Sequence, residues 1–555
     1  MSSLSSIIRD PDTSANTSTE GMMWSTEDGS NTFCINELPL LLRKLQQAFF
    51  LIDENNIQKA ATGGSLSFLQ NSDAKNCLAL CPAQSIFALG DPTFCADYGV
   101  RYPYMAGSMA NGIASVELVE ALANADMLAS FGAAGLMIHE IEKAILRLKE
   151  SLGDKPFAFN LIYSPNEKGH EDSVVDLYLK HDVTLVETSA YMKLTLPVVR
   201  YRLTGIHKDE AGNVVVPNKI IAKASRIELA THWFSPAPEK LVNQLVEQGL
   251  LTAEQAELAK QIPMAQDLTV EADSGGHTDN RPAITLLPTI IALRDRLQRQ
   301  YQYKSPLRVG AAGGIGTPGS ALAAFAMGAA YIVTGTVNQA CRESGSSDLV
   351  RNMLANAEQA DVTMAPAVDM FEMGVKLQVL KRGTMFAMRG NKLYDIYKEY
   401  DSIDAIPAVE RERLEKTVFK MSLEDVWDTT KAFFNERDPA EISKAEQNPK
   451  HKMALIFRWY LGLSSRWANA GVEDRQVDYQ IWCGPAMGAF NEWTRDSFLE
   501  TPEARDAVTV AMNILFGAAV MNRIHVISKQ GVKLDDELTQ YRPLPLNEIE
   551  QYLAG

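Results

Sequence analysis

From Arg101 onward, short apolar runs alternate with longer stretches of helical periodicity, a pattern that predicts parallel strands joined by helices. The predicted strands are Tyr102–Ala106, Met127–Phe131, Phe157–Leu161, Thr184–Thr188, Lys219–Ala224, Leu268–Ala272, Arg308–Ala311 and Tyr331–Thr334. Eight such units predict an α/β fold, a closed (β/α)8 TIM barrel with its functional loops at the C-terminal ends of the strands.

Helices between these strands are clear in places. His139–Ser151 carries Ile141, Ile145 and Leu148 on one face and stops at Gly153. Two further helices are predicted, at Ile284–Gln300 and Gly319–Met327.

Two insertions interrupt the barrel pattern. Residues 206–216 place a turn-forming DEAGN segment between two β-prone runs, which predicts a hairpin. Residues 236–262 are helical by periodicity, with Gly249 ending a first helix and Thr252 capping a second through a capping box with Gln255.

The barrel, assigned to residues 101–354, is flanked on both sides. Residues 1–33 are rich in Ser, Thr, Asp and Asn and are predicted to be disordered. Residues 34–100 form an N-terminal extension that packs on the barrel, with a helix predicted over Leu38–Ile57. Residues 355–555 are rich in Trp, Tyr and Met and predict an all-α C-terminal region. That region is a lid, a dimer surface or a partner-docking surface.

Composition narrows the function classes. A net charge of −16 and the lack of a basic aromatic stripe argue against a nucleic-acid binder. The 6 cysteines and the lack of a signal peptide predict reduced thiols in the cytoplasm. The spacing of Cys77 and Cys81 is compatible with a metal site, but no second Cys/His pair with ligand spacing follows, so we expect no metal site. The apolar run Val508–Met521 is too short to span a bilayer.

Glycine-rich loops follow the last two predicted strands. Gly313 and Gly314 come after the seventh strand, and Gly335 and Thr336 after the eighth. Glycines at strand ends let backbone N–H groups approach an anion, and this pair of loops matches the phosphate site of many (β/α)8 barrels. The alternatives are close helix packing and, for the uncharged stretch Ser320–Thr336, a membrane span.

The loop after the first strand contains Met109, Ala110 and Asn111, followed by Gly112. Small residues there let a flat ring lie against the backbone, and Asn111 offers hydrogen bonds to it. The alternative is a tight turn in which Asn and Gly serve for their positive φ.

A histidine follows paired glycines after the sixth strand, in Gly275-Gly276-His277. At the catalytic end of a barrel, His277 can exchange a proton near neutral pH, with Asp273 and Asp279 nearby. Its alternative is a histidine with no catalytic part.

Two polar residues end other strands. Lys223, at the end of the fifth strand, places a cation under the barrel mouth, and Asn160, in the third, is a similar candidate. Solvent-reaching strand-end side chains are the alternative.

These strand ends together resemble the nitronate monooxygenase superfamily of FMN barrels, which includes flavin-dependent bacterial enoyl reductases. The segments that carry the resemblance are Met109-Ala110-Asn111-Gly112, Gly275-Gly276-His277, Ala312-Gly313-Gly314-Ile315 and Gly335-Thr336. Further segments are similar to the stand-alone enoyl reductases of polyunsaturated fatty acid synthases and to the trans-acting enoyl reductases of polyketide assembly lines. These are Cys81–Gln84, Gly90–Pro92, Tyr98–Arg101 and Gly112–Val119.

The resemblance implies FMN and NADPH as cofactors and a trans-2-enoyl thioester on an acyl carrier protein as substrate. Gly313, Gly314, Gly335 and Thr336 would hold the FMN phosphate. The isoalloxazine would lie against Met109, Ala110 and Asn111, with Asn160 and Lys223 at its polar edge. Reduced FMN would deliver hydride to Cβ, while His277, beside the flavin with Gly275 and Gly276, would protonate Cα or stabilise the enolate. The sequence reads Asp273-Ser274 where nitronate relatives commonly have Glu-Ala, which changes the surroundings of His277.

The alternatives are nitronate oxidation by O2 on the same scaffold and a scaffold subunit that has lost its flavin. An acidic carrier protein would need a basic docking patch, for which the candidates are Lys376, Lys381, Arg382, Arg389 and Lys392. A solvated helix face is the alternative there. A homodimer is a further possibility.

Overall fold

A closed barrel of eight parallel strands is the centre of the computed structural model, which describes residues 21–68, 74–164 and 169–554. Around the barrel the strand order is β10-β13-β14-β16-β17-β7-β8-β9. The strands are β7 (Tyr104–Ala106), β8 (Leu128–Phe131), β9 (Ala158–Ile162), β10 (Leu185–Ser189), β13 (Lys219–Ala224), β14 (Asp267–Glu271), β16 (Arg308–Ala312) and β17 (Ile332–Thr334). The predicted TIM barrel is confirmed.

Helices surround the barrel and bury the apolar faces that the periodicity indicated. In α4, for example, Ile141, Ile145 and Leu148 are each buried. The helices are α3 (Val116–Asn124), α4 (Ile138–Leu152), α5 (His170–Lys180), α6 (Leu196–Leu203), α7 (Ile227–Phe234), α10 (Ala283–Tyr301), α11 (Pro318–Ala326) and α12 (Thr336–Gln339).

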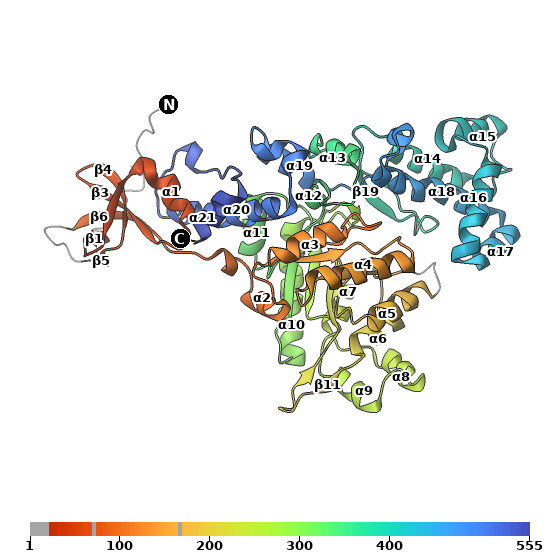
Figure 1. The fold of residues 1–555 in the computed structure, drawn as a ribbon, viewed down its shortest axis with the longest axis horizontal. Coiled ribbons are helices and arrows are strands. Elements are labelled where there is room, and N and C mark those ends of the chain that lie inside the picture. The colour runs from red at the N-terminus through yellow and green to blue at the C-terminus, as the bar shows by residue number, and fades with distance from the viewer. Residues whose placement is uncertain (1–20, 69–73, 165–168, 555) are drawn as a thin grey trace.

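Both insertions have the predicted structure. Residues 206–216 form the hairpin β11 (His207–Lys208) and β12 (Val214–Val215), and the second insertion holds α8 (Glu239–Glu247) and α9 (Ala253–Ala259). The capping box is present, with Gln255 N donating to Thr252 Oγ1 at 3.1 Å and Thr252 N to Gln255 Oε1 at 2.9 Å. Both insertions lie at the lower end of the barrel in Figure 1, away from the helical C-terminal region.

The N-terminal extension differs from its prediction. Only α1 (Leu38–Arg43) of the predicted Leu38–Ile57 helix forms, and the chain then continues into a six-stranded sheet. Asn55 and Asn56, with φ of 58° and 63°, make the tight turn of its central hairpin. The strands are β1 (Met23–Ser25), β2 (Asn31–Cys34), β3 (Phe49–Glu54), β4 (Ile57–Thr62), β5 (Ser65–Ser67) and β6 (Lys75–Cys81). Disorder was thus wrong for residues 21–33, and residues 1–20 lie outside the described residues.

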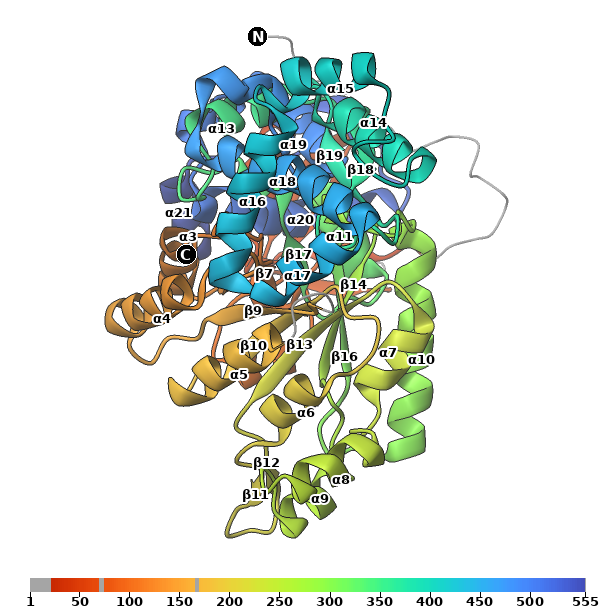
Figure 2. The ribbon, with the colours of Figure 1, turned by 90° about the vertical axis from the view of Figure 1, so that its right-hand side faces the viewer.

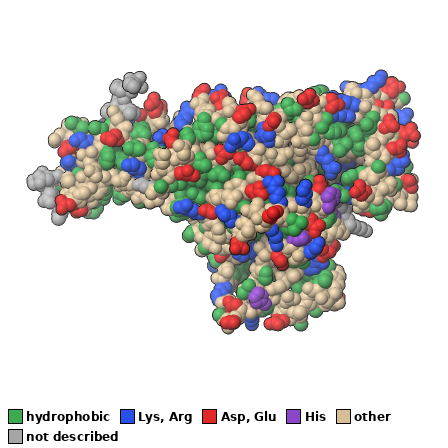
Figure 3. Space-filling view, viewed as in Figure 1, with side chains coloured by type: hydrophobic (Ala, Val, Ile, Leu, Met, Phe, Trp, Pro, Cys, Tyr) green, Lys and Arg blue, Asp and Glu red, His purple; other side chains and the backbone are tan. Residues whose placement is uncertain are grey.

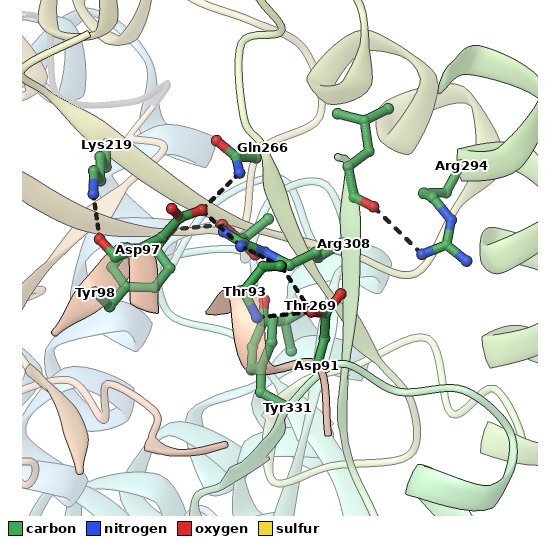
Figure 4. Close-up of polar contacts among 12 residues, drawn as sticks. Asp91, Thr93, Asp97, Tyr98, Lys219, Gln266, Thr269, Arg294, Arg308 and Tyr331 are labelled. Carbon is green, nitrogen blue, oxygen red and sulfur yellow. Dashed lines mark hydrogen bonds and ion pairs between the residues drawn. The ribbon is translucent and has the colours of Figure 1, made fainter. Parts of the chain in front are cut away.

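A short helix, α2 (Pro92–Tyr98), closes the N-terminal end of the barrel. Phe94 stacks on Tyr331, with ring centroids 4.1 Å apart, and Tyr98 donates to Asp267 Oδ2 at 2.7 Å. Arg308 binds the same carboxylate through Nε at 2.7 Å and reaches Asp97 at 2.7 Å (Figure 4). Because this end is filled by packed side chains, the C-terminal end is the one left for a ligand.

The C-terminal region is mostly helical, but the all-α prediction is wrong in one place. β18 (Val362–Pro366) and β19 (Lys376–Leu380) form a three-stranded sheet with β15 (Gly276–His277) from the barrel loop. The helices are α13 (Asp348–Ala355), α14 (Phe386–Glu399), α15 (Ala408–Leu414), α16 (Leu423–Arg437), α17 (Pro439–Gln447), α18 (Pro449–Ala470), α19 (Ala486–Thr494), α20 (Ala507–Ser528) and α21 (Leu546–Ala554). Figure 2 shows α14 and α18 above the barrel strands.

Helix α20 connects the three parts of the molecule. It packs on α11 and α3 of the barrel and on α1 and β6 of the extension, so the N-terminal sheet rests on α20 while α2 contacts the barrel itself. In the described residues α20 is the one helix long and apolar enough to cross a membrane, but 78% of its most apolar window is buried inside the protein. Its apolar surface is therefore that of a core helix.

Candidate active site

A cavity of about 540 Å³ lies at the C-terminal end of the barrel, and every predicted site residue lines it. These residues are Met109, Ala110, Asn111, Asn160, Lys223, Gly275, Gly276, His277, Gly313, Gly314, Gly335 and Thr336. The outer wall comes from α16 and α18, which contribute Phe433, Phe434 and Trp459 among others. The structure thus brings the predicted strand ends together and adds a roof that carries aromatic and polar side chains.

Two glycine loops lie side by side on one wall, because β16 pairs with β17. A Cβ on Gly314 or on Gly335 would meet no atom within 4 Å, whereas a Cβ on Gly313 would stand 2.6 Å from the Ala272 backbone. Gly314 and Gly335 therefore border open space, and Gly313 is required by packing. This cradle of bare backbone fits an anion such as a phosphate.

The loop after β7 has the positive φ that its sequence suggested, at 58° for Asn111 and 69° for Gly112. Asn111 Nδ2 donates to Ser465 Oγ of α18 at 2.9 Å. Ser108 N donates to Glu187 Oε2 at 2.7 Å. The loop is thus held from above by the C-terminal region and from below by a buried carboxylate.

A buried charge cluster lies beneath the cavity. Lys223 Nζ is 3.6 Å from Glu187 Oε1 and 3.8 Å from Glu271 Oε1. Burial opposes the charge on Lys223, but the two carboxylates outweigh it and raise its pKa. For Glu271 burial is the larger effect, and it raises the pKa of this carboxyl although Lys223 acts to lower it. Lys223 is therefore a permanent cation at the cavity floor.

Asn160 lies beside this cluster with its amide nitrogen already engaged. Nδ2 donates to Glu187 O at 3.1 Å and to Ser189 Oγ at 2.8 Å. Its side-chain oxygen is the atom left to accept a hydrogen bond from a ligand.

His277 has a carboxylate partner that the sequence did not indicate. Its Nε2 lies 3.1 Å from Asp369 Oδ1, in the segment between β18 and β19. Burial alone would lower the pKa of His277, but Asp369 outweighs burial and the pKa lies above its ordinary value. The expected neighbours are bound elsewhere, since Asp279 pairs with Arg226 and Asp273 accepts from Asn280 and Gln378.

Gly275 and Gly276 have structural reasons to be glycine. A Cβ on Gly275 would stand 2.8 Å from Cys483 N, so its backbone packs directly on the C-terminal chain. Gly276 has a φ of 80° and pairs with Gln378 in the added sheet. This packing fixes His277 at the cavity wall.

Sequence reasoning missed Glu187, Glu271, Asp369 and the cavity face of α16 and α18. For the two glutamates a signal existed, because each is an ionisable residue within a predicted barrel strand, Glu187 in the middle of β10 and Glu271 at the end of β14. For Asp369 there was none, since it is 92 positions from His277.

Most cations of the candidate basic patch are paired with carboxylates and are not free to bind an acidic partner. Arg382 pairs with Glu358 and Asp361, Arg389 with Asp478, and Lys392 with Glu410. Carboxylates thus neutralise three of the cations in that run. On the face shown in Figure 3, acidic and basic side chains are interspersed.

Several known proteins are similar to this chain in sequence and in fold. The family described as nitronate monooxygenase matches residues 94–392, and the inserted helical domain of [acyl-carrier-protein] S-malonyltransferase matches residues 400–479. A polyunsaturated fatty acid synthase polypeptide of Thraustochytrium sp. is 49% identical over 465 residues, covering 82% of this chain and 31% of that protein. The polyketide biosynthesis protein PksE of Bacillus subtilis is 45% identical, and the alignment covers 78% of this chain and 56% of that protein.

Among solved structures, the enoyl reductase domain of MlnA from the macrolactin cluster of Bacillus amyloliquefaciens is 38% identical with a TM-score of 0.75. The alignment covers 80% of this chain and 99% of that domain. The chain spans less than a third of the two fatty acid synthase polypeptides that it resembles, at 31% and 24% of their lengths. With the family match extending across the whole barrel, the chain belongs to the nitronate monooxygenase family.

Proposed function

We propose that this chain is an FMN-dependent enoyl reductase that uses NADPH to reduce trans-2-enoyl thioesters on an acyl carrier protein. The pathway would be the assembly of polyunsaturated fatty acids or polyketides. The observation that carries the proposal is a single cavity joining an anion cradle, a buried cation and a carboxylate-paired histidine under a helical roof. The similarity to the MlnA enoyl reductase domain supports the reaction class.

The cavity fits FMN on the residues present. Gly313, Gly314, Gly335 and Thr336 would hold the phosphate, because all four line the cavity and Gly314 and Gly335 border its open space. Met109, Ala110 and Asn111 would lie against the isoalloxazine, and Asn160 and Lys223 would face its polar edge. Bound FMN supplies hydride transfer between NADPH and Cβ of the enoyl group.

The protein supplies the charges and the proton. Lys223, a buried cation at the cavity floor, would stabilise the negative charge of a reduced flavin. His277, whose pKa Asp369 raises, would donate the proton to Cα or a hydrogen bond to the thioester oxygen as enolate charge develops. Phe434 and Trp459 line the cavity from the roof and would reduce the access of water, which would strengthen these interactions.

Nitronate oxidation by O2 is the second candidate, and the family match favours it over unrelated chemistries. There His277 would act as a base. A carboxylate partner at 3.1 Å suits His277 to either role, so the similarity to the MlnA enoyl reductase domain is what favours reduction.

The two functions separate in anaerobic half-reactions of the flavin-loaded chain. We expect NADPH to bleach the flavin and a crotonyl-pantetheine thioester to restore its absorbance within the turnover time. Flavin that stays reduced with the thioester, together with oxidation of propyl nitronate in air, would assign the second function. A preparation that takes up no flavin would contradict both. A homodimer and a cytoplasmic location stay predictions of the sequence.

A further inference from the structure

Arginines from the helical roof line the cavity. Arg458, Gly462 and Arg466 recur every four residues on α18, so they share one helix face, and all three line the cavity. Arg437, in the last turn of α16, lines it as well. In a chain with a net charge of −16, cations gathered at one opening need a reason.

Two of these arginines meet at the same barrel loop. Arg466 Nη2 donates to Gly135 O at 3.4 Å, and Arg437 Nη1 lies 4.0 Å from Met137 Sδ. The two guanidinium groups therefore approach positions two residues apart, in the loop after β8. Within the described ranges no carboxylate is within ion-pair distance of Arg466, whereas Arg458 pairs with Glu372 at 3.5 Å.

The loop after β8, which Arg437 and Arg466 approach, lies across the barrel mouth from His277, the proposed proton donor. His277 follows β14, and β8 is four strands from β14 in either direction around the closed barrel. Along α18, Arg466 is about 12 Å from Arg458 by helical rise. Arg458 is on the inner side, since its charge contributes to lowering the pKa of Asp369, the partner of His277.

We propose that Arg437 and Arg466 form a second phosphate site, for a phosphate ester joined by a long arm to a group that reacts near His277. The inference rests on the proposed function. Two ligands have this chemistry, the 4′-phosphopantetheine arm of a carrier protein and NADPH with its 2′-phosphate. Guanidinium groups suit either phosphate because they bind its oxygens in pairs.

The test measures binding, so it does not depend on turnover. Calorimetry on the flavin-loaded full chain compares 4′-phosphopantetheine with pantetheine, and 2′-phospho-ADP-ribose with ADP-ribose. We expect the phosphorylated member of one pair to bind about tenfold or more tightly. Arg466→Gln and Arg437→Gln should remove that preference, and the pair affected identifies the ligand. Arg466→Lys, which keeps charge but loses the fork, should retain only part of it.

Arg299→Gln is the matched control, an exposed arginine of α10 outside the cavity, and should leave all four affinities unchanged. Retained flavin and an unchanged unfolding midpoint show that each variant is folded. The proposal is overturned if the intact protein shows no preference in either pair, or if both glutamine variants keep it. Loss of enoyl reduction with the preference intact would instead count against the proposed function alone.

Discussion

At the scale of single residues, the site is defined by pairs in which one member sets the state of the other. Asp369 holds His277 at 3.1 Å and raises its pKa, and two carboxylates do the same for Lys223. Both cations therefore stay charged over a wider pH range than isolated side chains would. This suits the proposed reaction, in which negative charge would develop beside both side chains.

Replacing Asp369 by Asn should move the pH dependence of enoyl reduction. A proton donor with a raised pKa works below that pKa and fails as the pH rises through it, so removing the carboxylate brings the alkaline limb to lower pH. The measurement is the pH profile of flavin reoxidation by crotonyl-pantetheine. Asp279→Asn, which breaks the Arg226 pair instead, is the control. An unmoved limb in Asp369→Asn would show that His277 is not the titrating donor.

A matched pair of glycine variants separates cofactor binding from folding. Gly335→Ala adds a methyl group where no atom lies within 4 Å, so flavin retention should fall while the flavin-free protein keeps its unfolding midpoint. Gly313→Ala forces a Cβ to 2.6 Å from the Ala272 backbone at a φ of 84° and should also lower the midpoint. Flavin content after gel filtration and thermal unfolding provide the two readouts. Full flavin retention in Gly335→Ala would place the phosphate elsewhere.

At the scale of elements, α2 closes the N-terminal end of the barrel and is held there by hydrogen bonds to a buried ion pair. Arg308 and Asp267 are 1% and 0% exposed, and Tyr98 of α2 donates to the same carboxylate. This helix leaves the cavity open at one end of the barrel only.

Arg308→Met should destabilise the fold by about 3–5 kcal/mol, because it leaves the Asp267 carboxylate buried without its cation. Denaturant unfolding measures the loss. Arg294→Met breaks the more exposed pair with Asp295 and a long hydrogen bond to Leu307 O, which Figure 4 draws, and should cost about 1 kcal/mol. Equal losses of stability in the two variants would mean that the buried Arg308–Asp267 pair adds no more stability than a partly exposed pair.

The barrel elements could be predicted from the sequence, because a strand buried on both faces leaves an apolar run that turns and helices separate. The N-terminal sheet could not. Leu38, Leu41, Leu42, Leu45 and Phe49 have helical spacing and are all buried, yet the chain becomes extended after Arg43. The periodicity thus identified the buried positions and missed the geometry.

Candidate residues on barrel loops were predictable for the same reason, since topology alone gathers the strand ends. The contributions of α18 and Asp369 were not, because they reach the cavity through tertiary contacts between segments distant along the chain.

At the scale of the whole molecule, the outer wall of the cavity comes from a region outside the barrel, the helices α16 and α18. The β15–β19 pairing and the Asn111–Ser465 contact connect the roof to two barrel loops on different strands. Barrel and roof should therefore respond to a ligand as one unit.

Hydrogen exchange with and without FMN tests this coupling. We expect slower exchange on FMN binding in residues 107–112, 275–277, 312–316 and 335–339 and also along α18, because the ligand fills the space between them. The hairpin at residues 206–216, at the other end of the barrel, is the internal control. Protection confined to the barrel loops would show that the roof does not enclose the ligand.

The account depends most on the anion cradle between the β16 and β17 loops, and the affinity of the flavin-free chain for FMN compared with riboflavin tests it directly. Riboflavin presents the same ring without the phosphate. Two charge-assisted hydrogen bonds to that phosphate are worth about 3 kcal/mol or more, which predicts that FMN binds at least about 100-fold more tightly. Equal affinities for the two flavins would contradict the assignment of this cradle and of the cofactor it holds.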